Sequence, residues 1–332
     1  MINSSLGIGP MSSEIIEAVF KYSHYYRKGL MLIPSKNQID YNRGYVNNWT
    51  TSKFIDSINL MRKRFDNSDV KICRDHCGPG FNGVDSLEDT YNTIRNDIKS
   101  GFDLIHIDFC HFKGNREEQL KETKKAIIFC LKLNPNISIE VGTDENLGVN
   151  YSLPNLREIR QEIAFFKKFC NPEYFVVQTG SLVKEVSQVG SFNDDFVKNI
   201  SELLHNEGVK LKEHNADYLS KEEIIRRAGF VDAMNIAPQL GVIQTTLILK
   251  KCMVYGISYD EFFKEVYNNK KWNKWLQNNS KENKMLCFLI AGHYHFASEA
   301  YKKLIRELEK REDIHENIIN EIMEVIDHYE RK

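Results

Sequence analysis

The sequence predicts an α/β fold, a (β/α)8 TIM barrel with a C-terminal helical extension. Short apolar runs recur at intervals of about 34 to 40 residues, and a helical pattern of apolar residues fills each interval. Strands that alternate with single helices form βαβ units and therefore a parallel sheet. Seven clear strands and one shorter candidate fit a closed barrel better than an open sheet, although a doubly wound sheet remains the alternative.

The predicted strands and helices alternate through residues 1–245, which we assign to the barrel. The strands are expected at 6–9, 29–34, 70–76, 102–108, 137–142, 174–180, 209–214 and 233–238. The helices are expected at 15–20, 51–65, 87–99, 117–133, 156–169 and 196–206, with a further helix after Ser220. Ser86 and Ser220 are each followed three residues later by an acid, which is typical of a capping box at a helix start.

Residues 246–332 show only helical patterns and are predicted to be a helical extension packed on the barrel. Aromatic residues are frequent in its first part, and apolar residues from Leu304 to Ile326 have heptad-like spacing. We expect these helices to cover one end of the barrel. A homodimer surface is the second interpretation of the same stripe.

The composition excludes several classes of protein. A net charge of -1 offers no basic field for nucleic acid. No apolar run approaches the ~18 residues of a membrane span, and no signal peptide is visible. The seven cysteines form no C-x-x-C pair, which is typical of reduced thiols in a cytoplasmic protein.

Polar residues stand where nearly every predicted strand ends. Because the carboxyl ends of barrel strands surround one site, we expect these side chains to converge. They are Lys36, Gln38, Asp75, His76, Asp108, Glu140, Asp144, Gln178, His214, Asp217 and Asn235. The centre of this set is Asp75-His76, which ends an apolar strand and is followed by Gly78-Pro79-Gly80.

Two histidines and an acid in this set have the residue types of a divalent metal site. His76 and His214 would bind a divalent metal, and Glu140 or another acid would complete a set of three protein ligands with an open position. His106 is the second-choice ligand. Such a metal would act as a Lewis acid on a carbonyl or an enediolate.

The other polar residues at the strand ends have different predicted roles. Asp75 and Asp108 are the acid/base candidates. The remaining set would contact substrate hydroxyls: Lys36, Gln38, Asp144, Gln178, Asp217 and Asn235. Surface or structural roles are expected for His111, His293 and His295.

These motifs resemble a known family, over about residues 10 to 245. The matching segments, in chain order, are Ser35-Lys-Asn-Gln38, Asp75-His76-x-Gly78-Pro79, His106-x-Asp108, Gly142-Thr143-Asp144 and Glu213-His214-x-x-Asp217-Tyr218. They resemble the accessory ("non-catalytic") subunit of class II D-tagatose-bisphosphate aldolase. More distantly, the chain is similar to the zinc-dependent class II fructose-bisphosphate aldolases.

The aldolase resemblance implies specific roles. Asp75 would be the acid/base residue, and His76 and His214 would bind zinc. Glu140-Val-Gly142 and Asn235-Ile236 resemble a Glu-x-Gly segment and a substrate-contacting Asn-Ile pair.

The chain departs from the aldolases at two positions. It has Gln178-Thr-Gly-Ser181 where they have a further zinc histidine. It has Asn215-Ala-Asp-Tyr218 where they have a glycine-rich phosphate loop.

Together these features predict a metal-dependent carbohydrate enzyme. The expected chemistry is reversible aldol cleavage, or epimerisation, of a sugar or sugar phosphate. The rival hypothesis is a non-catalytic subunit that stabilises an aldolase partner.

Overall fold

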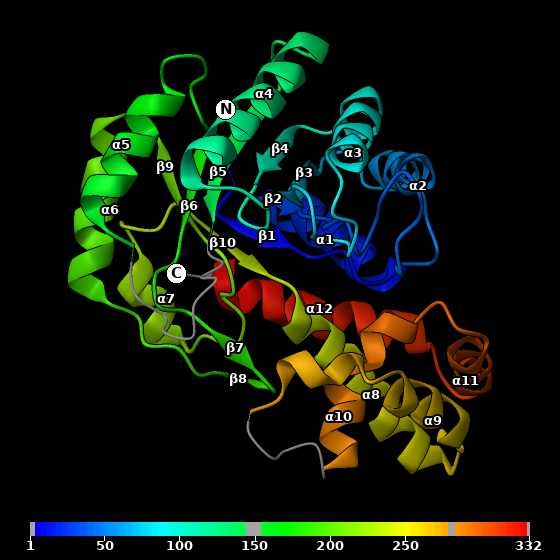
Figure 1. The fold of residues 1–332 in the computed structure, drawn as a ribbon. Coiled ribbons are helices and arrows are strands. Elements are labelled where there is room, and N and C mark those ends of the chain that lie inside the picture. The colour runs from blue at the N-terminus through cyan, green and yellow to red at the C-terminus, as the bar shows by residue number, and fades with distance from the viewer. Residues whose placement is uncertain (1–3, 144–153, 278–282, 331–332) are drawn as a thin grey trace.

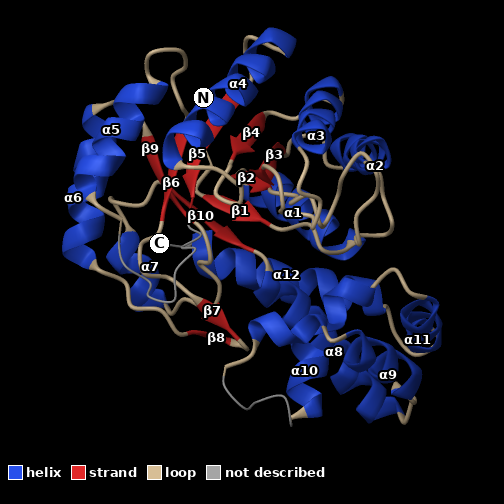
Figure 2. Ribbon diagram, in the orientation of Figure 1, coloured by secondary structure: helices blue, strands red, loops and turns tan. Residues whose placement is uncertain are grey.

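The computed structural model describes residues 4–143, 154–277 and 283–330, and it contains the predicted closed barrel (Figures 1 and 2). Its eight parallel strands are β1 (Leu6–Ile8), β2 (Gly29–Leu32), β3 (Asp69–Cys77), β4 (Leu104–Ile107), β5 (Ser138–Thr143), β6 (Tyr174–Val177), β9 (Lys210–Glu213) and β10 (Ala233–Ile236). β1 closes the barrel because it pairs with both β2 and β10. The short first strand is therefore the eighth strand of the barrel, and the doubly wound alternative is wrong.

Helices surround the barrel on the outside (Figure 2). They are α1 (Ser13–Tyr26), α2 (Thr51–Arg64), α3 (Leu87–Lys99), α4 (Arg116–Leu133), α5 (Leu156–Phe166), α6 (Asp194–Asn206), α7 (Lys221–Arg227) and α8 (Pro238–Tyr255). The predicted caps are present: Ser86 accepts the Asp89 N–H, and Ser220 and Glu223 form a full capping box. A hairpin that the sequence did not indicate, β7 (Val183–Lys184) with β8 (Ser187–Gln188), lies between β6 and α6.

The helical extension follows α8 and lies beside the barrel, in the lower right of Figure 1. It consists of α9 (Asp260–Asn269), the 3-10 helix η1 (Lys271–Trp275), α10 (Lys284–Ala291), the 3-10 helix η3 (Gly292–His295), α11 (Glu299–Glu309) and α12 (Ile314–Glu330). The expected boundary at residue 245 falls inside α8, so the barrel and the extension share one helix.

The heptad-like stripe of the extension is buried within the chain. Ile318, Ile322 and Ile326 on α12 are fully buried, and α12 packs against α1 and α8. This stripe is therefore part of the core and leaves no apolar surface of its own for a second copy. No helix in the described part of the chain combines the length and hydropathy needed to cross a bilayer.

The barrel interior has an apolar lower layer and a charged upper layer. The lower layer is a small cluster of side chains that includes Met31, Cys73, Leu104 and Tyr174. Above it, the side chains of successive strands are polar, because residues two apart on a strand face the same side. The strand ends therefore present polar groups to the carboxyl face of the barrel, where TIM-barrel sites are built.

Candidate metal centre and active-site cavity

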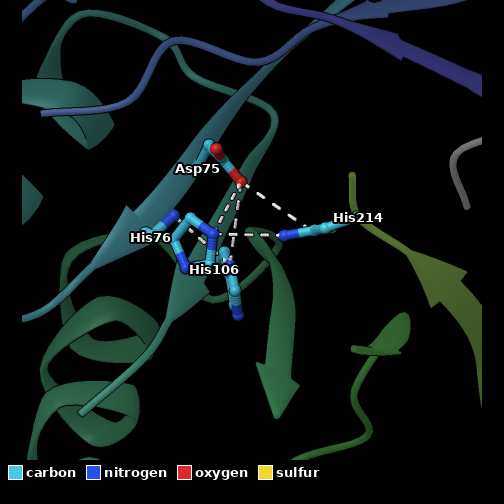
Figure 3. Close-up of side chains that lie close together, drawn as sticks. All are labelled: Asp75, His76, His106 and His214. Carbon is cyan, nitrogen blue, oxygen red and sulfur yellow. Dashed lines mark hydrogen bonds and ion pairs between the residues drawn. The ribbon is translucent and has the colours of Figure 1, made fainter. Parts of the chain in front are cut away.

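Four polar side chains converge at the carboxyl end of the barrel (Figure 3). Asp75 and His76 come from β3, His106 from β4, and His214 follows β9. Each offers one candidate ligand atom, and these atoms lie within 4.8 Å of one another. Figure 3 shows the three imidazoles and the carboxylate facing one another across this small space. Imidazole nitrogens with a carboxylate are a ligand set that suits zinc and other divalent metals.

The end of β3 has an irregular backbone that brings His76 into the cluster. The pairing with β4 shifts register between Arg74 and Cys77, and His76 has a φ of 43° in the left-handed region. Few non-glycine residues adopt this conformation, and it is found disproportionately at functional sites. Gly78 follows, and a Cβ built there would lie 1.6 Å from the backbone oxygen of Asp108. Only glycine permits this close approach of the two strand ends.

Hydrogen-bond partners fix the orientation of each imidazole. His76 Nδ1 lies 2.9 Å from Asp108 Oδ2, and His106 Nε2 lies 2.9 Å from the Gly142 oxygen. His214 Nε2 lies 3.3 Å from Glu140 Oε1. The second ring nitrogens also have neighbours: His214 Nδ1 is 3.2 Å from His76 Nε2, and His106 Nδ1 accepts the backbone N–H of His76 at 3.3 Å. Metal-binding histidines are held in this way by carboxylates and carbonyls behind them.

The Asp75 carboxylate has the features of a side chain that contacts a bound ligand. Its Oδ1 is buried and accepts no hydrogen bond among the described residues, and its nearest imidazole neighbours are 3.8 to 4.0 Å away. Burial raises the pKa of Asp75, but His76, His214 and His106 outweigh this effect and hold it well below its usual range. A buried, ionised oxygen without a partner is costly unless a cation or a donor completes it.

Glu140 lies behind the cluster and is paired with a lysine. Lys212 Nζ is 2.7 Å from Glu140 Oε2, and both side chains are almost fully buried inside the barrel. Burial raises the pKa of Glu140, but Lys212 and His106 lower it to about 2. The structure thus places Glu140 next to His106 and His214, with its second oxygen already used.

Asp108 supports the cluster through His76. It also accepts the backbone N–H of Cys110 and is only 3% exposed. Burial raises the pKa of Asp108, but the hydrogen bond from His76 lowers it to about 2. This carboxylate is therefore placed to orient His76 and carries its charge next to that ring.

The predicted substrate-contacting residues divide into two groups. Lys36 and Gln38 line the same cavity as Asp75 and His76. Asp217 is 1% exposed, and its Oδ1 accepts the N–H groups of Ala237 and Gln239 at the start of α8. Burial raises the pKa of Asp217 to about 7, although these N–H groups act in the other direction.

Gln178 and Asn235 are buried at the ends of β6 and β10. Gln178 Oε1 accepts the Gly180 N–H. Both amide atoms of Asn235 are without a hydrogen-bond partner among the described residues, and Gly7 leaves the space that this amide fills. Asp144 lies outside the described residues.

Thr179 and Ser181, which follow Gln178 after β6, have a structural role. Thr179 Oγ1 donates to Glu213 Oε1, and Ser181 Oγ does the same. Glu213 is also paired with the buried Arg227 at 2.7 Å. This network fixes the residue directly before His214, so the segment supports the cluster from behind.

The cavity at this end of the barrel has a volume of about 920 Å³. Asp75 and His76 lie on its barrel side, and residues of η1 and η3 lie on its other side. His293, expected to be structural, is 2% exposed and lines this cavity. The sequence predicted that the extension covers one end of the barrel, but it did not indicate which residues of the extension line the cavity, because that depends on long-range packing.

Comparison with known proteins supports the fold assignment. No protein-family profile and no curated protein matches the sequence. Among solved structures, a Sinorhizobium meliloti 1021 protein described as a probable tagatose 6 phosphate kinase superposes with a TM-score of 0.81 at 14% identity, over 98% of this chain and 99% of that one.

Two aldolases also share the fold. They are the YdjI aldolase from Escherichia coli K12 (TM-score 0.55, 16% identity, 93% of this chain and 94% of that one) and fructose-bisphosphate aldolase from Campylobacter jejuni (TM-score 0.59, 13% identity, 96% and 91%). The chain therefore has the barrel fold that these two aldolases share, as predicted. Because identities are this low, the comparison establishes fold and leaves activity to the site.

Proposed function

We propose that this chain is a metal-dependent carbohydrate enzyme of the class II aldolase type, which cleaves or epimerises a sugar or sugar phosphate. The convergence of Asp75, His76, His106 and His214 carries this proposal. Its metal ligands are His76, His106 and His214, with zinc the expected ion. Glu140, which the sequence placed among the ligands, orients His214 in the proposed arrangement and lies 3.6 Å from His106 Nδ1.

The residues present fit a divalent cation. Three imidazoles are held from behind, and the unpartnered oxygen of Asp75 lies beside them. When bound, the metal would supply Lewis-acid polarisation of a substrate carbonyl. Three protein ligands leave a position open for substrate.

Asp75 is the acid/base residue in this proposal. It is ionised, it lines the cavity, and its Oδ1 is uncommitted among the described residues. It would accept the hydroxyl proton whose removal permits cleavage of the adjacent C–C bond, and it would return that proton after re-addition. Epimerisation follows if re-addition occurs on the opposite face of the carbonyl.

The other polar groups would hold the substrate in position. The unpartnered amide of Asn235 can both donate to and accept from a hydroxyl group. Lys36 and Gln38 lie on the cavity wall, where Asp89 holds the Lys36 ammonium at 2.6 Å. Such positioning groups raise the rate by fixing the reacting atoms in a productive geometry.

Metal analysis of the purified protein tests the centre. We expect about one divalent ion per chain in the wild type and its loss in the His76→Ala, His214→Ala double variant. The matched control is His24→Ala with His205→Ala, two histidines outside the cluster. Unchanged metal content in the first double variant, with circular dichroism showing a folded protein, would refute the centre.

Turnover is tested separately with NMR detection of aldol cleavage or epimerisation on a panel of ketoses and ketose phosphates. Asp75→Asn should keep the metal and lose roughly 10²- to 10⁴-fold in rate. If the wild type binds metal but turns over nothing, and an aldolase subunit co-purifies with it, the accessory-subunit hypothesis is the better one.

A further inference from the structure

The wall of the cavity opposite the barrel carries a group of lysines. Lys270, Lys271 and Lys274 come from η1 and the residue before it, and all three line the cavity that also contains Asp75 and His76. We call these three residues the lysine wall. The η1 segment follows α9 and precedes α10 in the extension, which lies beside the barrel (Figure 1).

The lysine wall has no carboxylate within ion-pair distance in the described parts of the chain. By contrast, other lysines of the extension are paired, as Lys251 is with Glu312 and Lys303 with Glu261. Aromatic rings provide the contacts instead: Lys271 Nζ is 5.1 Å from the Tyr294 ring centroid. Lysines directed at a cavity without acidic partners leave a positive potential there for an anion.

The electrostatics of neighbouring groups agree with this picture. Burial and the proximity of Lys274 lower the pKa of Lys271, so two ammonium groups are held together at a cost. Burial lowers the pKa of His293 to about 3, and Lys274, His295 and Lys271 contribute to this shift. Nδ1 of His293 is buried and has no hydrogen-bond partner among the described residues.

The usual phosphate position of such barrels is closed in this chain. TIM barrels frequently bind phosphate at a helix N-terminus near the last strands, where backbone N–H groups are open. Here the helix after the last strand is α8, and the carboxylate of Asp217 already accepts the N–H groups of Ala237 and Gln239. A phosphate at that position would meet a buried carboxylate that competes for the same donors.

We propose that the lysine wall binds a phosphoryl group of the substrate, so that the helical extension supplies an anion site in place of the closed position at the start of α8. This inference rests on the proposed function for the identity of the substrate as a carbohydrate. Arg43 lines the same cavity from the loop after β2 and adds a guanidinium to the site. Lysine binds phosphate as a compact point charge, and several lysines match a dianion better than they match a carboxylate.

Binding to metal-free protein tests the inference without relying on catalysis. After chelator treatment, inorganic phosphate, a hexose phosphate, a uronic acid and a neutral hexose are titrated, with calorimetry and tryptophan fluorescence as readouts. Trp275 is a suitable reporter because Lys274 Nζ is 4.8 Å from its ring. We expect the hexose phosphate to bind at least tenfold more tightly than the uronic acid or the neutral hexose.

Variants connect this binding to the lysine wall. Lys271→Gln with Lys274→Gln should weaken phosphate binding at least tenfold, and the Arg pair at the same positions should restore most of it. The matched control, Lys250→Gln with Lys264→Gln, removes two exposed charges from the same extension and should leave binding unchanged.

Two results would overturn the proposal: unchanged phosphate binding in the Gln pair, or a uronic acid that binds more tightly than the phosphate. Metal content is measured on untreated protein from the same preparations. Protein that holds no metal but still binds phosphate would contradict the proposed enzyme. Protein that holds its metal but does not bind phosphate would contradict the lysine wall alone.

Discussion

Replacing Glu140 with Gln probes the stability of the barrel and the support of its candidate metal centre together. The substitution removes the charge that faces Lys212 at 2.7 Å, inside a barrel where both side chains are almost fully buried. At that distance an effective dielectric of about 20 gives a Coulomb attraction of about 6 kcal/mol before desolvation is subtracted. Removing one partner of a buried pair costs about 3–5 kcal/mol.

In Glu140→Gln the Lys212 ammonium would keep its contact with an aromatic ring. We therefore expect the loss in the free energy of unfolding to lie at the lower end of this range. Lys212 Nζ is 5.1 Å from the ring centroid of Tyr174 and retains a cation–π interaction. We therefore expect Glu140→Gln to lower the free energy of unfolding by about 3 kcal/mol. Because His106 and His214 lose a charged neighbour, metal affinity should fall about 10- to 100-fold while the stoichiometry stays at one.

Urea unfolding of the metal-free protein and metal titration of the folded protein measure the two effects. Glu173→Gln is the matched control, because Glu173 forms an ion pair with Lys210, which is on β9 like Lys212. Lys210 Nζ and Glu173 Oε1 are 2.8 Å apart, and the side chains of Glu173 and Lys210 are 12% and 32% exposed. This control substitution should lower the free energy of unfolding by less than about 1 kcal/mol. If Glu140→Gln abolishes metal binding and leaves unfolding unchanged, Glu140 is itself a ligand and the supporting role is refuted.

Three further predictions concern the surroundings of the site. Gly78→Ala should destabilise the fold by more than about 2 kcal/mol in urea unfolding, because the new Cβ meets the backbone of Asp108, which cannot rotate away. Asp217→Ala should cost about 1–2 kcal/mol in the same assay, because α8 has no other side-chain cap at its start. The pKa of His315 is raised to about 9, chiefly by Glu14, so its stabilisation is complete below pH 6.5 and is lost as pH rises through about 9. In urea unfolding, the free energy of unfolding of the wild type should fall between pH 7 and pH 9.5, and the fall should be smaller in His315→Gln.

Each of these predictions has an outcome that contradicts it. For Gly78 the comparison is Gly83→Ala, where the added Cβ meets open space and only the positive φ is strained; equal effects would mean that strand approach is unimportant. A stable Asp217→Ala protein would show that water caps α8 equally well. An identical pH dependence in His315→Gln would assign the loss to other groups.

The fold was predictable because it depends on local periodicity. Apolar runs, their spacing and the capping signals at Ser86 and Ser220 placed the barrel strands and most helices correctly. The β7–β8 hairpin was not predicted, since its strands are two residues long and have no apolar pattern. The predicted boundary between residues 245 and 246 lies inside α8, which continues through it without a break.

The site was predictable only in part. The positions of residues at the strand ends predict which side chains converge, but they do not predict which of these side chains form hydrogen bonds or ion pairs with one another. Asp75, His76 and His214 were placed together by this reasoning. Glu140 is paired with Lys212, which is 72 positions away in the sequence, and no local pattern indicates this pairing. The lysine wall lies on the extension, whose position over the barrel follows from packing and has no motif.

The helix shared by the barrel and the extension has a consequence for substrate exchange. α8 packs closely on η3: a Cβ at Gly241 would lie 2.6 Å from the Cβ of His293, and one at Gly292 would lie 2.4 Å from Thr245 Oγ1. The far wall of the cavity is therefore fastened to the barrel through interlocking glycines, which leaves little room for hinge motion. We expect product to leave through a mouth of fixed width, and the turnover rate to be insensitive to the lid opening that limits many enzymes.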